Sequence, residues 1–296
     1  MIIFLCIFSY STFIGIDKIS LFWYNIEMIV KEERSRILSL FSKKDEKIFA
    51  AALIDNINHF ESNNYITNTD FLNMNEKRIA ESILNKFNIN YKTVSVFCDS
   101  ERFVIFMIPD YISDDALEDI FNEYISVLKI TPKSKVNISH SKYMGTIYSL
   151  GLKESVIGDI IVNNEVCYVS VLKSAESYFC NNLFSVARNE VKVEPLKIND
   201  DTLKNVRVKF EQKEILVASL RIDVVLSAAY NLSRNEVKLK IENGDLIINS
   251  KEMFFVAYTV QESDIVSFRR CGKFKIGKAH GNTRSGKTYL TIKKYV

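Results

Sequence analysis

Apolar residues recur at helical spacing along several stretches of the first two thirds of the chain. In residues 75–87, the side chains of Ile79, Ile83 and Leu84 fall on one side of a helix, as in an amphipathic helix that packs on a core. Ser113 is a suitable N-cap for another such stretch. The pattern predicts helices over residues 31–41, 45–59, 75–87, 113–129, 142–150 and 175–188.

Between these stretches lie short runs rich in β-branched and aromatic residues, which are typical of strands. Polar turns at 98–101 and 163–165 separate pairs of these runs and predict two hairpins. Strands are predicted over residues 93–97, 103–108, 136–138, 160–162, 166–172 and 191–196. Residues 28–206 are therefore predicted to be α/β, as two small subdomains of hairpins and helices that meet near Ile138.

The polar stretch 197–205 is the predicted linker to a last region with a different pattern. Apolar residues at 220, 222, 225, 226 and 229 predict an amphipathic helix, which ends at Tyr230 and Asn231. A second helix follows, and short strands are predicted over 246–248, 254–256 and 265–268. The region is therefore predicted to be a two-helix unit with a small sheet.

The start of that second helix carries a sharp local signal. Ser233 precedes Glu236 by three residues, which is the spacing of a capping box. Arg234 and Lys238 are four residues apart and share one exposed face, and Gly244 is suited to the left-handed stop at the end of the helix. The capping box is expected to be structural whether or not Ser233 also binds a ligand.

Charge is divided unevenly along the 296 residues, whose net formal charge is only +3. Residues 207–296 hold 17 Lys and Arg against 9 Asp and Glu, whereas the preceding residues hold 22 against 27. Residues 265–296 contain nine Lys or Arg and no acidic residue. Because like charges repel one another unless a polyanion is present, the C-terminal region is predicted to bind one.

A helix start is a natural position for a phosphate, because backbone N–H groups and the positive end of the helix dipole point toward it. We expect basic residues of the region to surround the start of the second helix. They are Arg234, Lys238, Lys240, Arg269, Arg270, Lys273, Lys275 and Lys278. For Arg221 and Asp223, pairing with each other or with neighbours is an equally good structural interpretation.

Other residue types indicate little chemistry. The five cysteines are scattered without a CxxC pair, and the three histidines lack metal-ligand spacing, so we expect reduced thiols, no disulfide and no metal site. None of the nine glycines forms a GxGxxG or P-loop motif, so no cofactor is expected. No catalytic set is evident, and the chain is predicted not to be an enzyme.

Residues 1–27 do not fit the rest of the chain. Met1–Ile16 is uncharged and apolar, but it lacks the basic start of a signal peptide and is shorter than the roughly 20 residues that span a bilayer. We expect that translation starts at Met28 and that this extension is not native. The alternative is a short segment that associates with a membrane.

The C-terminal region resembles the S-four RNA-binding domain. The resemblance covers residues 215 to about 275. Its motifs are Leu220 to Leu226, Leu232 to Val237, Ile241 to Gly244, Ile248-Asn249 and Asp264 to Val266. It implies RNA contacts at Arg221, Ser233, Arg234, Lys238, Arg269 and Arg270.

The resemblance continues upstream to YlmH-type proteins of Gram-positive bacteria. It rests on His140 to Gly145, Leu150 to Lys153 and Ile157 to Ile160, and at the C-terminal end on Arg284 to Lys287. The family implies a cytoplasmic factor that binds the large ribosomal subunit and peptidyl-tRNA in ribosome-associated quality control. Arg284 and Lys287 join the candidate RNA-binding residues on this basis.

The predicted fold class is α+β, and the resemblance implies that an RNA-recognition-motif-like α/β region precedes the S-four domain. The predicted divisions are the extension 1–27, an N-terminal domain 28–138, a middle subdomain 139–206 and an S-four domain with a basic tail, 207–296. The predicted partners are ribosomal RNA, the large subunit and tRNA or peptidyl-tRNA. No small-molecule substrate and no membrane partner are expected.

Two other functions are open to a chain of this composition. Some enzymes that modify RNA, such as pseudouridine synthases and methyltransferases, carry an S-four module beside a catalytic domain. A membrane or division-site scaffold would instead use the apolar N-terminus and the basic tail on anionic lipid. A modified nucleoside in treated RNA would indicate the first, and partition to lipid would indicate the second.

Overall fold

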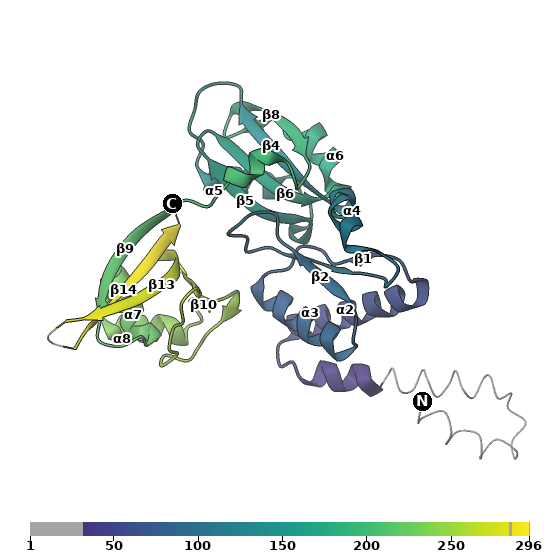
Figure 1. The fold of residues 1–296 in the computed structure, drawn as a ribbon. Coiled ribbons are helices and arrows are strands. Elements are labelled where there is room, and N and C mark those ends of the chain that lie inside the picture. Colours follow the sequence, from purple (N-terminus) through teal and green to yellow (C-terminus); the bar gives the residue numbers. More distant parts are fainter. Residues whose placement is uncertain (1–31, 284–285, 296) are drawn as a thin grey trace, which may run out of the picture. The chain divides into compact units, whose positions relative to one another are not determined.

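The computed structural model describes residues 32–283 and 286–295. The predicted extension 1–27 and the start at Met28 lie outside these residues. The chain forms two compact units: the residues up to Tyr65 together with Ile79–Ile89, and Ile66–Arg78 together with the chain from Asn90 onward. Figure 1 traces both along the sequence. No helix of the described residues is long and apolar enough to cross a membrane.

The smaller unit is helical. It contains a helix over residues 32–39, α2 (Lys44–Asn63) and most of α3 (Met74–Lys86). One side of α2 is buried, through Leu53, Ile54 and Ile57, because these apolar residues recur at helical spacing. An ion pair of 2.6 Å between Lys86 and Glu33 joins α3 to the first helix.

The larger unit begins with a three-stranded antiparallel sheet in the order β1-β3-β2. Its strands are β1 (Thr67–Asn68), β2 (Tyr91–Val94) and β3 (Val104–Met107). Every residue of β3 is buried. The short helix η3 (Asp114–Ala116) leads into α4 (Leu117–Tyr124), whose Phe121 ring lies 4.6 Å from that of Phe106 in β3.

A five-stranded antiparallel sheet follows, in the order β5-β6-β4-β8-β7; we call it the middle sheet. Its strands are β4 (Ile125–Pro132), β5 (Ile157–Asn163), β6 (Val166–Leu172), β7 (Ser185–Val186) and β8 (Asn189–Leu196). The helices between them are α5 (His140–Ser149), η4 (Glu154–Val156) and α6 (Lys173–Asn182). The central strand, β4, lies before the predicted division at 138/139, so the middle sheet extends across that division.

Both faces of the middle sheet are covered. Because side chains alternate along a strand, Leu128 and Val169 join Tyr143 of α5 and Phe179 of α6 in one core cluster. On the other face Val127 and Tyr168 pack with three side chains from outside the sheet. They are Phe97, Leu203 and Val206. The residues predicted as a linker, 197–205, therefore include part of a core, and η5 (Asp201–Asn205) forms within them.

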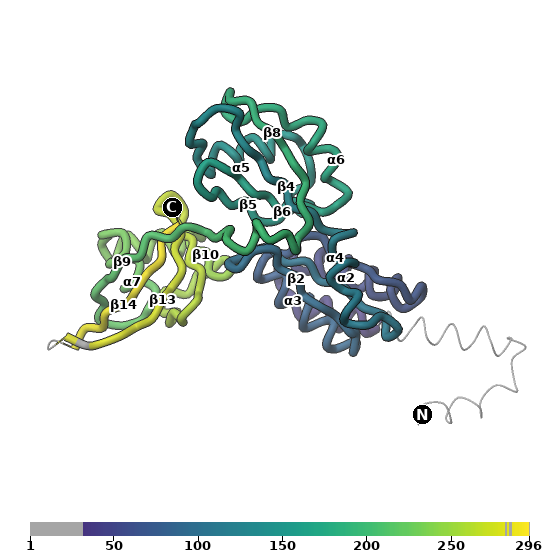
Figure 2. Tube along the Cα trace, turned by 45° about the horizontal axis from the view of Figure 1, so that its top comes forward, coloured from purple at the N-terminus to yellow at the C-terminus, as the bar shows by residue number. Residues whose placement is uncertain are grey.

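The rest of the chain, which we call the C-terminal module (residues 207–296), contains a six-stranded antiparallel sheet in the order β11-β10-β12-β13-β14-β9. The strands are β9 (Phe210–Val217), β10 (Leu246–Ile248), β11 (Lys251–Glu252), β12 (Ile265–Phe268), β13 (Gly272–Asn282) and β14 (Thr288–Tyr295). Helices α7 (Ile222–Tyr230) and α8 (Arg234–Glu242) pack on one face of this sheet through a shared apolar core. Figure 2 shows β9 beside β14, and the two strands pair over eight positions.

Several predicted elements differ from the observed ones. The helix predicted over 113–129 ends at Tyr124, because the following run forms β4. A strand that is buried on both faces carries a continuous apolar run, which periodicity does not distinguish from a helix. The helix predicted over 175–188 ends at Asn182, and residues 136–138 and 254–256 form no strand. The strands β9, β13 and β14 were not predicted. The mixed α+β class is confirmed.

Candidate nucleic-acid interface

The start of α8 is fixed by the turn that precedes it. Asn231 ends α7 in the left-handed conformation, with φ 56°. Ser233 then caps α8: its hydroxyl accepts a hydrogen bond from the Glu236 backbone N–H at 3.2 Å, and its own N–H donates to the Glu236 carboxylate at 2.8 Å. The predicted capping box is confirmed. The Ser233 hydroxyl therefore already serves the helix, and phosphate binding by this residue stays a prediction.

A buried carboxylate joins two of the predicted RNA-binding arginines. The Asp223 side chain, at the start of α7, is only 4% exposed, and it accepts hydrogen bonds from Arg234 and, at 3.0 Å, from Arg221 Nε. The two arginine side chains are 45% and 60% exposed. Asp223 thus fixes both guanidinium groups side by side, at the surface and beside the start of α8.

This arrangement keeps Asp223 charged. Burial disfavours the charged carboxylate, but hydrogen bonds from Arg234 and Arg221 outweigh that effect and hold the pKa of Asp223 below its ordinary value. A guanidinium group has five N–H donors in a rigid plane, so each arginine retains donors after it has bonded to Asp223. Two adjacent guanidinium groups with outward donors are suited to a phosphate or carboxylate.

The two lysines of α8 differ in availability. Lys238 is 59% exposed, with Glu242 at 3.8 Å on the same helix, which is a weak surface pair. Its position confirms the predicted exposed face shared with Arg234. Lys240 is less exposed: it lies 3.8 Å from Asp245, and its ammonium stands 5.7 Å from the centre of the Phe268 ring.

The prediction that the strand-end arginines surround the start of α8 is wrong. Arg269 and Arg270 form the turn between β12 and β13, where the Arg269 backbone N–H donates to the Asp245 carbonyl at 2.9 Å. Asp245 follows the C-terminal end of α8, so this turn lies at the end opposite Ser233. Lys278 and Lys287 are exposed on β13 and just before β14, and Arg284 lies outside the described residues.

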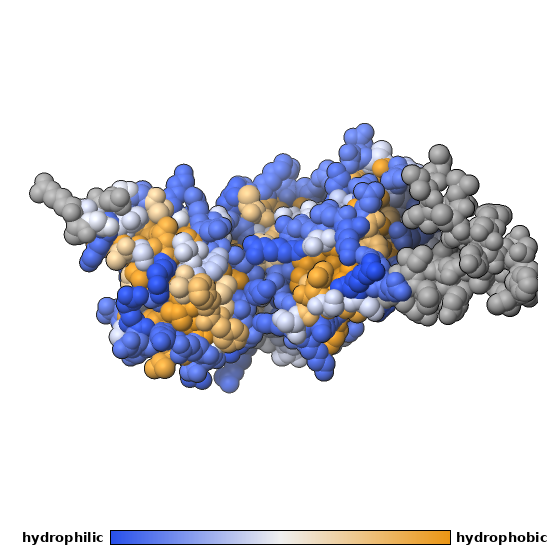
Figure 3. Space-filling view, turned by 90° about the horizontal axis from the view of Figure 1, so that it is seen from below, coloured by the Kyte–Doolittle hydropathy of each residue, from blue (hydrophilic) through white to orange (hydrophobic). Residues whose placement is uncertain are grey.

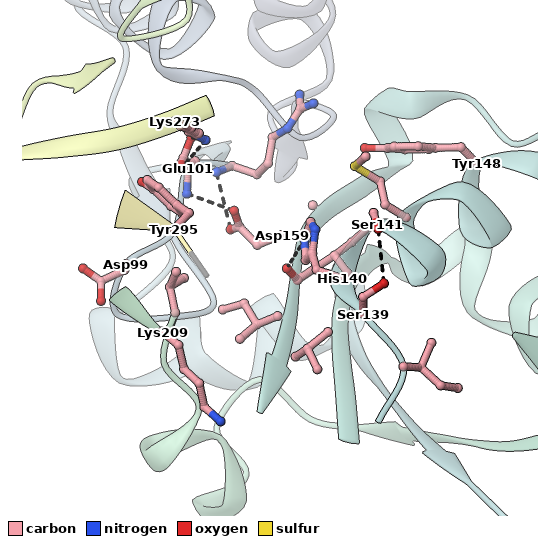
Figure 4. Close-up of a pocket in the computed structure, with 18 of the residues that line it drawn as sticks. Asp99, Glu101, Ser139, His140, Ser141, Tyr148, Asp159, Lys209, Lys273 and Tyr295 are labelled. Carbon is pink, nitrogen blue, oxygen red and sulfur yellow. Dashed lines mark hydrogen bonds and ion pairs between the residues drawn. The ribbon is translucent and has the colours of Figure 1, made fainter. Parts of the chain in front are cut away.

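Lys273 and Lys275 also lie away from the start of α8. In β13 they alternate with Phe274 and Ile276, which face the core under the helices, so the lysines face the other side of the sheet. Both are paired: Lys273 binds the Glu101 carboxylate at 2.6 Å, and Lys275 lies 3.6 Å from Asp99. Figure 4 shows Lys273 beside Glu101 and Tyr295. The basic side chains of the module therefore occupy separate surfaces.

Upstream, α5 and β5 place several polar groups at one cavity, which Figure 4 shows. His140 bonds through Nε2 to the Ile160 carbonyl at 3.0 Å, and the hydroxyls of Ser139 and Ser141 lie 3.2 Å apart. Asp159 accepts the Glu101 backbone N–H at 2.9 Å. Burial raises the pKa of Asp159 to about 6, although hydrogen bonds to the carboxylate oppose this effect.

The sequence alone did not show that one carboxylate holds both arginines. The local signal was the spacing of Arg221 and Asp223, which was equally consistent with a simple pair. Arg234 lies 11 positions beyond Asp223, and only the packing of α7 against α8 brings it to the same carboxylate. In the part of the chain that the structure describes, no group of three His, Cys, Asp or Glu side chains is arranged to hold a metal ion.

Comparison with known proteins shows similarity to a protein family and to a curated protein. Residues 121–200 match a family model described as the putative RNA-binding domain in YlmH. The chain is 23% identical over 252 residues to the ribosome-associated protein quality control protein P2 of Bacillus subtilis (strain 168), covering 85% of this chain and 96% of that protein.

A solved structure is also similar. It is the cell division protein YlmH from Streptococcus pneumoniae, with 19% identity and a TM-score of 0.46, covering 53% of this chain and 93% of that one. The family match spans the middle sheet with α5 and α6, where the upstream motifs lie. The resemblance to YlmH-type proteins that these motifs predicted is therefore confirmed.

Proposed function

We propose that this protein is a cytoplasmic RNA-binding factor that associates with the large ribosomal subunit and peptidyl-tRNA in translation quality control. We further propose that the C-terminal module is an S-four RNA-binding domain and that the region before it is RNA-recognition-motif-like. The match to a putative RNA-binding domain and the name of the Bacillus subtilis relative support a ribosomal role.

One observation carries the proposal: two exposed arginines fixed by the buried carboxylate of Asp223 next to the start of α8. Pre-ordered guanidinium groups lose little side-chain entropy when they bind a phosphate. They belong to a module with a net charge of +8, which attracts a polyanion over a longer range. A contact of this kind fits a ribose-phosphate backbone.

The region of the middle sheet is expected to contact RNA through surfaces other than the two faces of the sheet. RNA-binding sheets present aromatic side chains on an open face, whereas both faces here are covered by apolar side chains. Residues 121–200 hold nine basic and eight acidic residues, so their attraction for phosphate is weak. The loops and helix starts around α5 are the proposed contacts of this region.

The test is co-sedimentation with ribosomal subunits over a series of salt concentrations. Replacing Arg234 and Lys238 by Glu is expected to weaken binding by about 100-fold or more, because two phosphate contacts become repulsive. Glutamine at both positions is expected to lower the slope of log affinity against log salt by about 0.7–0.9 per lost contact. Circular dichroism checks that each variant is folded.

A matched control keeps the same change of charge elsewhere. Arg36 and Lys204 are 72% and 75% exposed in surface ion pairs, and glutamate at both is expected to leave ribosome binding within about threefold of wild type. Wild-type affinity in the folded Arg234 and Lys238 variant, or an equal loss in the control, would refute this site.

A further inference from the structure

Two consecutive aromatic side chains stand out of the C-terminal module. Phe254 is 53% exposed and Phe255 is 64% exposed, and Leu239 on α8 is 60% exposed. Figure 3, seen from below, shows apolar surface over this module on the left, bordered by hydrophilic side chains. Single exposed apolar residues are common, but neighbouring exposed aromatic rings indicate a binding surface.

The loop that carries these rings is held in place by its other residues. Met253, Val256 and Tyr258 pack against the module's core. The Met253 backbone N–H donates to the Leu246 carbonyl at 2.9 Å, and the Tyr258 hydroxyl donates to Asp264 at 3.0 Å. The two phenylalanines are therefore presented outward from an anchored segment.

This loop runs from the turn after α8 to the start of α7. At one end, a Cβ on Gly244, just after α8, would lie 3.3 Å from the Phe254 ring, so the ring rests on that turn. At the other end, the Tyr258 carbonyl accepts the Ile222 N–H at 2.7 Å, and Thr259 forms a bridge with Arg221. One anchored segment therefore carries both aromatic rings and ends beside Arg221.

We propose that Phe254 and Phe255 form a stacking platform for unpaired nucleobases, with the adjoining backbone phosphate contacted by Arg221 at the end of the loop. This inference rests on the proposed RNA-binding function and specifies its ligand as RNA with unpaired nucleotides. Aromatic rings bordered by cations bind single-stranded nucleic acid because every base offers a face for stacking. Phenylalanine has no polar group, so the platform tolerates any base.

Charge favours RNA over a protein partner as the occupant. Arg221 lies at one end of the loop, the Arg269 backbone bonds to the turn at the other end, and the module's net charge is +8. In a duplex the base faces are already stacked, so the rings would gain nothing from paired RNA. The platform therefore distinguishes loops, bulges and single strands from continuous helices.

The experiment uses the full-length chain and two RNA probes: a hairpin with an unpaired loop, and a blunt duplex with the same stem. Replacing Phe254 and Phe255 together by Ala is expected to weaken hairpin binding by about 10-fold or more and to leave duplex binding unchanged. Phe255→Tyr is expected to retain affinity and Phe255→Leu to lose it. Phe184→Ala is the matched control, since Phe184 is 68% exposed outside the module.

A fluorescence measurement reports stacking directly. Trp23 is the single tryptophan of the chain, so Phe255→Trp in a Trp23→Phe background gives one probe at the platform. The hairpin is expected to quench its emission and the duplex is not. Tryptophan in place of Phe184 serves as the control and is expected to show no quenching with either RNA.

The outcomes separate this inference from the function on which it rests. If wild type binds neither RNA at low salt, both are overturned. If wild type binds both and the double Ala variant keeps the same preference for the hairpin, only the stacking platform is overturned. If that variant binds both RNAs normally but no longer co-sediments with ribosomes, the surface contacts a protein and the platform is likewise overturned.

Discussion

The middle sheet and the sheet of the C-terminal module follow the same plan on one face and differ on the other. Each packs a pair of helices on one face through an apolar core. The second face of the middle sheet is closed by Phe97, Leu203 and Val206, whereas that of the C-terminal sheet carries Lys273 and Lys275. A related difference appears in charge, which is nearly balanced in residues 121–200 and +8 in the module.

The comparison shows that helices on one face of a sheet do not determine what the other face presents. What matters is which side chains the remaining surface presents and whether the chain has already covered it. In the middle sheet, apolar side chains at the outer face stabilise the fold. In the C-terminal module, the anchored arginines stand at the starts of α7 and α8, and the exposed aromatic rings stand on the loop after β11.

The largest effect is expected from placing a charge in the covered second face of the middle sheet. Val206 is 2% exposed in the cluster with Phe97 and Tyr168, so Val206→Asp would bury an unpaired charge. We expect the free energy of unfolding to fall by about 3 kcal/mol or more. Thermal denaturation, with hydrogen exchange of the β4 and β6 amides, measures this loss. Asn205→Asp is the exposed neighbouring control, and equal stability of the two variants would show that the face is not closed.

A second effect concerns pH and Asp159 of β5. Burial raises the pKa of this carboxyl from 3.8 to about 6, so between these values the folded state binds more protons than the unfolded state. The stabilisation that this group contributes is therefore present in full below pH 4 and is lost as pH rises through 6, by about 3 kcal/mol.

The Asp159→Asn variant lacks this titration. The melting temperature of wild type minus that of the variant is therefore expected to fall as pH rises from 4 to 7. A constant difference over that range would contradict the raised pKa. The result sharpens the contrast with Asp223, whose pKa the arginines lower.

The smallest effect tests how Asp223 acts in RNA binding. Removing a negative charge near a phosphate would by itself strengthen binding. If Asp223 instead positions Arg221 and Arg234, Asp223→Asn weakens RNA binding, by about 10-fold or roughly 1.4 kcal/mol. Glu242→Gln removes an exposed carboxylate from the same module and is expected to strengthen binding slightly. Filter binding measures both, and tighter binding by Asp223→Asn would exclude a positioning role.

The sequence predicted features that depend on neighbouring residues. The capping box at Ser233 and the left-handed stop at Gly244, with φ 81°, are both present, because each needs only a few consecutive residues. Strand β4 was misread because its burial depends on β6 and β8, which lie far along the chain. The long strands β13 and β14 were missed since their lysines and glycines lower the local strand signal.

The residues of the candidate site also divide into those readable from local sequence and those set by tertiary packing. Arg221, Arg234 and Lys238 were identified as candidates by motif and charge, which are readable from the sequence. The shared carboxylate and the exposed Phe254 and Phe255 depend on tertiary packing. The spread of the other cations over several surfaces depends on it too, because alternation along β13 and the position of the β12–β13 turn decide where each side chain points.

The pairing of β9 with β14 gives residues 288–295 a structural role. Residues 288–295 were predicted to be part of a basic tail, yet their backbone bonds to the first strand of the module along its whole length. A premature stop codon shortly before Thr288 would make β13 an edge strand and leave β9 without the strand it pairs with, and unpaired strand edges are templates for aggregation. Shortened products of this gene are therefore expected to precipitate or be degraded, even though every helix residue remains encoded.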